Sequence, residues 1–165
     1  MFFQLIESHF FVLLAGMAAG IAIGIKLAKL PIKVHAFAVC DSKQYFEQHI
    51  EQMISALCED PAKHDLSNIS DLIDINDTYK GIGYAMSTTE ELNLLKSIAK
   101  TGIMLDPVYT VKAMNGFYKE RFFGDTAGDT LFVHTGGVFS NFAYVNQMNE
   151  AGLFDYSNET QTRLL

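Results

Sequence analysis

The hydrophobic positions of the chain change character within its first forty residues. Residues 10–14 form a continuous apolar run, which is typical of a buried strand. Residues 16–24 are small and apolar, as in a helix whose glycines let it lie close to a sheet. Pro31 ends that helix, and residues 33–39 carry hydrophobic side chains on both faces. The pattern therefore predicts a strand, a helix and a second buried strand.

The uncharged stretch of residues 10–25 has a second interpretation, as a membrane anchor or a signal peptide. It is 16 residues long, whereas a membrane-spanning helix needs about 20. A signal peptide begins with basic residues, but the only charged residue before this stretch is Glu7. We therefore favour the strand followed by a helix and do not expect a membrane partner.

The middle of the chain predicts two amphipathic helices separated by a polar loop. Residues 41–44 and 87–90 each have the spacing of a capping box, which opens a helix. Residues 59–80 are rich in Asp, Ser and Asn, so we expect a loop with one helical turn there. The apolar stripes fall at helical spacing at Ile50, Met53, Ile54 and Leu57 in the first helix, and at Leu92, Leu95, Ile98 and Ala99 in the second, which Gly102 follows.

The last third of the chain predicts two more helices and a strand. Residues 103–105 form a short extended piece, and Pro107 is placed in the first turn of a helix with apolar positions at Val111, Met114 and Tyr118. A turn at 124–128, a strand at 130–133, a tight Gly-Gly turn and a helix at 139–148 follow, and 153–165 is a loose polar tail. Alternating strands and helices predict one α/β domain over residues 1–165, a mostly parallel sheet with helices on both faces.

Composition and charge narrow the classes of function. Hydrophobic residues make up 49% of the chain and charged residues 19%, as in an ordinary globular domain. The net charge of −7 and the scattered basic residues argue against nucleic acid as a partner. Cys40 and Cys58 have no metal-ligand spacing, so we expect two reduced cysteines and no metal.

Two tyrosines are the best candidates for catalysis. Tyr84 follows a glycine and Tyr109 lies just after Pro107, so each phenol is placed at an element boundary, where it can face a cleft. A tyrosine with a lowered pKa acts as a general acid or base, although a half-buried structural tyrosine is the alternative. We expect Asp106 to cap a helix rather than to react, and Lys112 to be solvated.

Glycine-bearing junctions are the candidates for anion binding. Gly16, Gly83 and the pair Gly136 and Gly137 lie at predicted strand ends or helix starts, where backbone N–H groups can approach a phosphate or carboxylate. A tight turn is the alternative for each of them. His134, at a strand end, is expected to be packed or hydrogen-bonded rather than a base or a metal ligand.

Taken in order, these segments resemble the D-cysteine desulfhydrase and 1-aminocyclopropane-1-carboxylate deaminase family. Its members are fold-type II pyridoxal-phosphate enzymes related to the tryptophan synthase β chain. The resemblance covers about residues 12–145. The matching pieces are AAGIAIG (18–24), PIKVHA (31–36), GY (83–84), STTEEL (87–92), LDPVYT (105–110), KAM (112–114) and LFVHTGG (131–137).

The resemblance implies roles for particular residues. Tyr84 and Tyr109 match the two active-site tyrosines, which flank the substrate and handle proton transfer. Deaminases carry Glu at the position of Thr110 and desulfhydrases carry Thr, which favours D-cysteine as the substrate. The positions implied to contact the cofactor are Thr110, the ring-facing loop of Thr135, Gly136 and Gly137, and Gly16 in the phosphate cradle. The implied reaction is β-elimination to hydrogen sulfide, pyruvate and ammonia, in which pyridoxal 5'-phosphate stores the electrons of the carbanion.

Three departures from the family pattern shape the expected function. The phosphate cradle, Gly-Ser-Gly-Gly-Thr-like in the family, reads approximately LLAGM at residues 13–17, which retains only Gly16. The lysine that forms the Schiff base follows a Gly-Asn motif in the family's N-terminal half, and none of the ten lysines here follows an Asn. Val111 stands where the family usually has Gly.

We therefore expect a C-terminal fragment of a D-cysteine desulfhydrase-like lyase that is inactive alone. The alternatives are activity of the 1-aminocyclopropane-1-carboxylate deaminase type, and a catalytically inactive remnant that acts as a binding or regulatory partner. Expected partners are a small amino-acid substrate and either a second copy or a full-length paralogue. The expected compartment is the cytoplasm, with the mitochondrion as the alternative.

Overall fold

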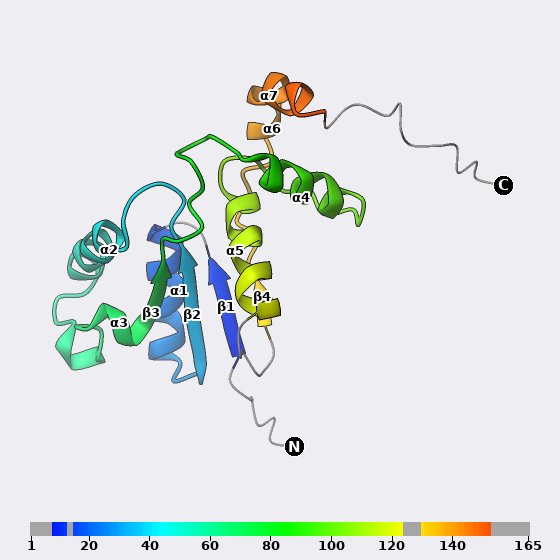
Figure 1. The fold of residues 1–165 in the computed structure, drawn as a ribbon. Helices are drawn as coiled ribbons and strands as arrows, with labels where there is room; N and C mark the ends of the chain where they lie inside the picture. Colours follow the sequence, from blue (N-terminus) through cyan, green and yellow to red (C-terminus); the bar gives the residue numbers. More distant parts are fainter. Residues whose placement is uncertain (1–7, 13–14, 124–129, 153–165) are drawn as a thin grey trace, which may run out of the picture.

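The computed structural model describes residues 8–12, 15–123 and 130–152, and the fold is built from four strands and the helices that connect them (Figure 1). The predictions for residues 13–14, 124–128 and 153–165 lie outside the described residues. The elements are β1 (Ser8–Val12), α1 (Ala15–Leu27), β2 (Ile32–Phe37), α2 (Lys43–Leu57), η1 (Ala62–His64), α3 (Ile69–Leu72), β3 (Ile73–Asn76), α4 (Thr89–Ala99), α5 (Thr110–Phe123), β4 (Thr130–Phe132), α6 (Ser140–Ala143) and α7 (Val145–Glu150).

The sheet is parallel throughout, with the strand order β3-β2-β1-β4. The chain adds strands on one side of β1 as far as β3 and then returns to add β4 on its other side (Figure 1). This reversal beside β1 is the place where open α/β sheets bind ligands, beyond the carboxyl ends of the strands. The predicted α/β class with a parallel sheet is confirmed.

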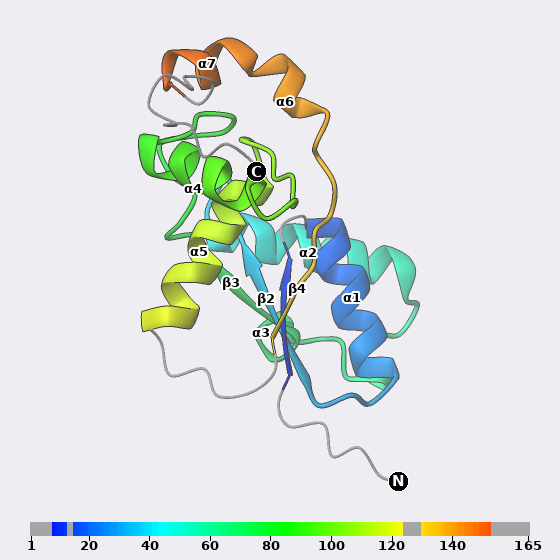
Figure 2. The ribbon, with the colours of Figure 1, turned by 90° about the vertical axis from the view of Figure 1, so that its right-hand side faces the viewer.

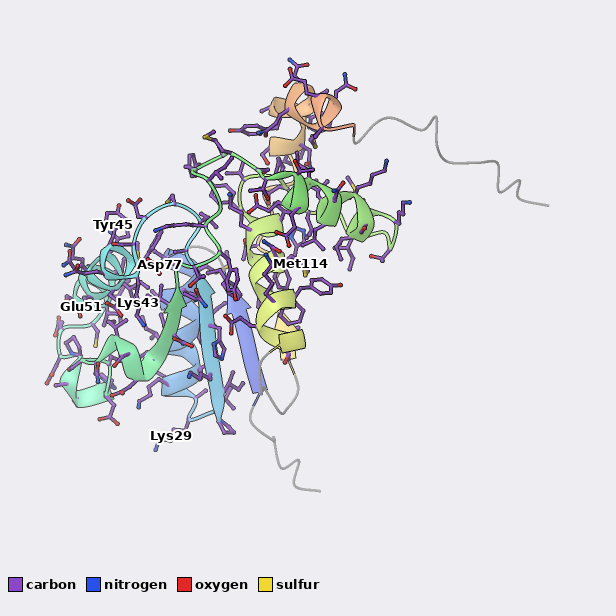
Figure 3. The ribbon with its side chains drawn as sticks, in the orientation of Figure 1. Lys29, Lys43, Tyr45, Glu51, Asp77 and Met114 are labelled. Atoms are coloured by element: carbon purple, nitrogen blue, oxygen red, sulfur yellow. The ribbon has the colours of Figure 1, made fainter. Side chains whose placement is uncertain are left out.

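Helices cover both faces of the sheet, with α1 and α2 on one face and α5 on the other (Figure 2). Alternating side chains of β2 serve the two faces. Val34 and Ala36 lie in the core with α1 and α2, whereas Phe37 packs with Ala113 of α5. At the far end of the strands, α4 packs on α5 through a separate cluster that includes Leu95 and Met114 (Figure 3).

The helix predicted at residues 16–24 is present as α1, but the reason given for its packing is wrong. Ala18, Ala19 and Ala22 are the residues buried against the sheet. Gly20 and Gly24 point away, and a Cβ added to either would meet nothing within 4 Å. Alanine is small enough for the close approach and favours the helix more than glycine does.

A strand was missed in the segment predicted to be a loop. Ile73–Asn76 forms β3, which pairs with β2 in parallel at the edge of the described sheet. Ile73 and Ile75 are buried while Asp74 is half-buried, so the strand alternates over only four residues. The residue after β3 contacts the start of α2, because the backbone N–H of Lys43 donates to the Asp77 carboxylate at 3.1 Å (Figure 3). That hydrogen bond lowers the pKa of Asp77.

Several helix boundaries differ from the prediction by a residue or more. Ser42 rather than Asp41 caps α2, and Leu57 is 75% exposed instead of buried. The capping box of α4 pairs Thr88 with Glu91, one residue later than expected. Residues 103–105 form no strand, α5 begins at Thr110, three residues after Pro107, and the last helix is divided into α6 and α7.

Among the described residues, none of the helices combines the length and the apolar character needed to cross a membrane. Residues 15–25, for which a membrane anchor was the alternative, belong to α1, and α1 packs on the sheet. The preference for a strand followed by a helix is therefore supported over the part of this stretch that the structure describes.

Gly116 lets α5 lie against the sheet, which generates a prediction for stability. A Cβ at this position would come within 2.5 to 3.0 Å of three ring atoms of Phe37. We expect Gly116→Ala to lower the free energy of unfolding by about 1–3 kcal/mol, because an overpacked core must shift. Gly20→Ala is the matched control, since it adds the same methyl to an open face of a helix, and it should stabilise by about 0.5–1 kcal/mol. Chemical denaturation of the two variants measures this difference, and equal effects would contradict it.

Candidate functional site

The two predicted tyrosines meet beyond the carboxyl ends of the strands. Tyr84 lies in the loop between β3 and α4, and Tyr109 immediately precedes α5. Their hydroxyls are hydrogen-bonded to each other, and their rings lie edge to face with centroids 5.8 Å apart. Tyr84 is 55% exposed, so the pair presents phenol groups at the surface. The structure thus brings together two candidates that are 25 positions apart in the sequence.

Tyr109, in this pair, keeps its phenolic proton to a higher pH than an ordinary tyrosine does. The hydrogen bond with Tyr84 is the main cause that raises the pKa of Tyr109 from 10.0 to about 12. Partial burial and the nearby Tyr84, Asp106 and Cys40 groups add to the rise. Our sequence analysis invoked a lowered pKa, so the direction is the opposite of that expectation. At neutral pH, Tyr109 is a neutral phenol that can donate a hydrogen bond.

Asp106 fixes the backbone on which Tyr109 is mounted. Its fully buried carboxylate accepts hydrogen bonds from the backbone N–H groups of Val108, Tyr109 and Thr110, at 2.7 to 2.9 Å. These groups would otherwise be unsatisfied, because they stand at the start of α5. The expectation that Asp106 caps a helix is confirmed.

The same carboxylate joins the glycine loop to the tyrosine segment. Gly137 has φ +86, and a Cβ there would lie 2.7 Å from Asp106 Oδ2, so this position requires glycine for two reasons. The hydroxyl of Ser140 approaches Asp106 Oδ1 at 3.4 Å, and the Asn141 amide donates to the Leu105 carbonyl at 2.9 Å. The loop after β4 is therefore positioned against Tyr109 through Asp106.

His134 and its neighbours shape the rest of this loop. His134 Nε2 donates to the Met104 carbonyl at 2.8 Å, and its Nδ1 accepts from the backbone N–H of Gly136. The prediction of a hydrogen-bonded histidine is confirmed. Thr135 and Gly136 are half-buried beside it, and Gly136 has φ +103.

Thr110 lies at the site but points inward. Its fully buried hydroxyl donates to Asp106 Oδ2 at 2.5 Å and accepts from the Asp106 backbone N–H at 2.6 Å. The single proton of this hydroxyl is therefore already engaged within the chain. Its role in cofactor binding stays a prediction, and a cofactor would have to compete with Asp106 for the donor.

The described residues do not fit pyridoxal phosphate as a cofactor held by this chain alone. Gly16 lies in the exposed first turn of α1, where a Cβ would meet only the Met53 side chain, at 3.9 Å. Its neighbours Ala15 and Met17 offer no hydroxyl to a phosphate. The nearest lysine in sequence to Tyr109 is Lys112, and its ammonium is fully buried and engaged. The Gly16 segment therefore supplies no hydroxyl for a phosphate, and Lys112 is not free to react.

Lys112 and Glu91 form a buried ion pair that our sequence analysis missed. Lys112 was expected to be solvated, but both side chains are at most 1% exposed, with 3.5 Å between Lys112 Nζ and Glu91 Oε1. Lys112 also donates to the carbonyls of Lys80 and Met86, each at 2.9 Å. Local spacing carried no signal for this burial, because the polar Asn115 lies one turn after Lys112 on the same side of the helix.

Other parts of the described structure offer no competing site with matching chemistry. A cavity of about 1090 Å³ opens where α1 ends and β2 begins, at the opposite end of the strands from the tyrosines. It is lined by surface lysines, aspartates and apolar side chains rather than by a convergent set of catalytic groups. Within residues 8–12, 15–123 and 130–152, no group of His, Cys, Asp and Glu could hold a metal ion, and Cys40 and Cys58 form no disulfide.

Comparison with known proteins agrees with this architecture. A solved structure described as an ACC deaminase homologue superposes with a TM-score of 0.73 over 87% of this chain and 43% of that one, at 23% identity, which supports the fold. A bifunctional D-cysteine desulfhydrase/1-aminocyclopropane-1-carboxylate deaminase of Arabidopsis thaliana is 39% identical over 137 residues, 81% of this chain and 32% of its own length. D-cysteine desulfhydrase of Serratia proteamaculans is 35% identical over 141 residues, 81% and 40% of the two chains. No protein-family model matches the chain.

The fold, which this chain shares in part with the ACC deaminase homologue, is that of the fold-type II pyridoxal-phosphate enzymes. Over the residues it matches, the chain is homologous to proteins named D-cysteine desulfhydrase and 1-aminocyclopropane-1-carboxylate deaminase. The resemblance seen in the sequence is confirmed. The chain spans about a third to two fifths of the length of these curated relatives.

The tyrosine pair generates a prediction for titration. We expect Tyr84→Phe to move the pKa of Tyr109 from about 12 toward 10, because it removes the hydrogen bond that is the largest cause of the rise. A raised pKa stabilises the fold below the ordinary value near 10, and this contribution is lost as the pH rises toward about 12. Tyrosine ring-carbon NMR against pH measures the change, and Tyr45→Phe on α2 is the control. An unmoved Tyr109 titration in Tyr84→Phe would contradict the pairing.

The Asp106 cap generates a prediction for stability. We expect Asp106→Ala to lower the free energy of unfolding by about 2 kcal/mol or more, because buried N–H groups at the start of α5 lose their acceptor. Ser42→Ala removes the exposed cap of α2 and should cost about 1 kcal/mol or less. Denaturant unfolding compares the two variants, and a cost for Asp106→Ala no larger than for Ser42→Ala would refute this role.

Proposed function

We propose that this chain forms the tyrosine-bearing and glycine-bearing wall of a D-cysteine desulfhydrase-type lyase site. The observation that carries the proposal is the Tyr84 and Tyr109 hydroxyl pair beyond the carboxyl ends of the sheet. Asp106 connects this pair to the Gly136 and Gly137 loop, which faces the cofactor ring by family resemblance. A substrate amino acid would meet neutral phenols that donate hydrogen bonds and hold protons at the tyrosine oxygens.

D-cysteine is the proposed substrate, with 1-aminocyclopropane-1-carboxylate as the alternative. Thr110 supports D-cysteine, because desulfhydrases of this family carry Thr at that position. The Serratia relative is named for D-cysteine alone and the Arabidopsis relative for both activities. In either case the reaction needs a Schiff-base lysine, which the chain's own Lys112 does not supply because its ammonium is buried.

We therefore expect the 165-residue chain to release no sulfide from D-cysteine by itself, even with added pyridoxal phosphate. Sulfide detection and cofactor absorbance measure this directly. Sulfide released by the purified chain in proportion to its concentration would contradict the proposal.

A chimera tests the positive part of the proposal. This chain would replace the matched portion of the Serratia enzyme. The remainder of that enzyme is the part in which the family resemblance places the Schiff-base lysine. We expect the chimera to release sulfide, and Tyr109→Phe in it to lower the rate at least about 100-fold, as expected on loss of a general acid or base. Tyr45→Phe, on the exposed surface of α2, is the matched control. A folded chimera that releases no sulfide, or one whose rate of sulfide release is unchanged by Tyr109→Phe, would count against the proposed site.

A second candidate function is that of a binding or regulatory partner of a full-length relative. Large apolar side chains are exposed on the Tyr84 loop and on and before α6: Ile82 at 63%, Met86 at 51%, Phe139 at 87% and Phe142 at 76%. Exposed apolar side chains grouped in this way are typical of surfaces that are covered in an assembly. Light scattering of the chain alone, and mixed with the Arabidopsis relative, distinguishes a monomer, a homodimer and a mixed complex. A monomer under both conditions would refute this candidate.

We place the chain in the cytoplasm, with the mitochondrion as the alternative. The mitochondrion is stated in the name of the Arabidopsis relative, for that protein. Fractionation of cells that express the tagged chain distinguishes the two compartments.

A further inference from the structure

We propose that Lys112, held by Glu91, is a positioning residue that clamps the Tyr84 loop so that the two tyrosine hydroxyls meet. Its effect on catalysis rests on the proposed function, but the clamp itself is a property of the described chain. Lys112 has no contact with either phenol among the hydrogen bonds that the structure describes, so it acts through the loop.

The hydrogen bonds of the ammonium group define the clamp. An ammonium has three N–H donors, and Lys112 directs them to the carbonyls of Lys80 and Met86 and to the Glu91 carboxylate. Lys80 and Met86 stand immediately before and after residues 81–85, the segment that carries Tyr84. One buried cation therefore fixes both ends of that segment.

Few other described contacts hold the shape of the loop; one is at its end, where the hydroxyl of Ser87, the residue after Met86, donates to the Pro107 carbonyl at 2.6 Å. Gly81 and Ala85 have φ +70 and +57, and the second is a conformation that an alanine rarely adopts. The described backbone hydrogen bond across the end of the segment, from Met86 N–H to the Gly83 carbonyl, is long at 3.3 Å. Tyr84 is more than half exposed, and its described hydrogen bond is to Tyr109. The position of Tyr84 therefore depends on the ends of the loop.

The backbone of the loop rests directly on the ion pair. A Cβ added to Gly81 would lie 2.6 Å from Lys112 Nζ and 2.9 Å from Glu91 Oε1. Glu91 is fixed independently, because its Oε2 accepts from the Thr88 backbone N–H at 2.7 Å in the capping box of α4. The clamp is thus anchored to the first turn of α4 and to the first turn of α5.

Joining α4 to α5 does not by itself require this pair. Lys119 and Glu90 connect the same two helices at 3.0 Å on the exposed surface. Well-packed hydrophobic residues often stabilise a core as well as a buried ion pair does, so a buried pair is weak evidence for a role in stability alone. The two carbonyl contacts are the feature that the exposed pair lacks, and they point to the loop.

The test measures contact between the tyrosines directly. The full chain is labelled at the tyrosine ring carbons, and the Tyr109 titration is followed by NMR in wild type, Lys112→Met and Tyr84→Phe. We expect Lys112→Met to move the Tyr109 titration most of the way to its position in Tyr84→Phe, although Tyr84 is still present. Asp106 and Cys40 also raise the pKa of Tyr109 and are unchanged in this variant, so the pKa should remain somewhat above its ordinary value. Lys119→Met is the matched control and should leave the titration at its wild-type position.

A second variant keeps the proposal testable where Lys112→Met does not fold. Gly81→Ala pushes a methyl group into the clamp without removing its charge. Gly102→Ala is its control, because it imposes the same strain at φ +87 with nothing within 4 Å. We expect Gly81→Ala, but not Gly102→Ala, to shift the Tyr109 titration. A wild-type Tyr109 titration in folded Lys112→Met, or in folded Gly81→Ala, would overturn the proposal.

These outcomes are separable from those of the proposed function. The NMR measurement needs neither substrate nor cofactor, so an inactive chimera leaves the clamp standing if Lys112→Met shifts Tyr109. Conversely, the chimera could be active while the Tyr109 titration is unchanged in Lys112→Met. That result would refute the clamp but support the proposed lyase site. In an active chimera with the clamp, Lys112→Met should lower the rate at least about 10-fold, and Lys119→Met should not.

Discussion

The buried ion pair between Lys112 and Glu91 is the interaction on which the site depends. Two charges at most 1% exposed carry a large cost of desolvation, and that cost is offset only if every donor and acceptor finds a partner. Here those partners are the carbonyls at the two ends of the Tyr84 loop and the first turn of α4. The requirement to satisfy a buried cation thereby fixes α4, α5 and the loop relative to one another.

A second carboxylate repeats this arrangement at the other side of the site. Glu91 caps α4 and holds the Tyr84 loop through Lys112, while Asp106 caps α5 and holds the glycine loop after β4. Each helix start thus satisfies its own N–H groups and also positions one segment of the proposed site. The two segments meet at the hydrogen bond between Tyr84 and Tyr109, which raises the Tyr109 pKa to about 12. The positions of Tyr84 and Tyr109 are therefore set by contacts at these helix starts rather than by contacts within the loops.

Much of the fold was predictable because it follows from local patterns. The parallel α/β class, the amphipathic stripe of α4 and the capping role of Asp106 were all found from the spacing of residues. The β3 strand was missed because only Ile73 and Ile75 alternate within a polar segment, and pairing with β2 supplies the rest of its stability. The packing of α1 was explained by its glycines, whereas its alanines make the contact, because periodicity alone does not say which of two small-residue stripes faces inward.

The sequence by itself determined the resemblance to the family and singled out two tyrosines as candidates for catalysis, since both depend on which residues follow one another. Only the tertiary structure decided that the phenols share a hydrogen bond, that Thr110 points to Asp106, and that Lys112 is buried rather than solvated. The physical reason is that burial and pairing depend on segments distant in the chain. The Lys80 and Met86 carbonyls, which make a buried lysine tolerable, lie 32 and 26 residues before it.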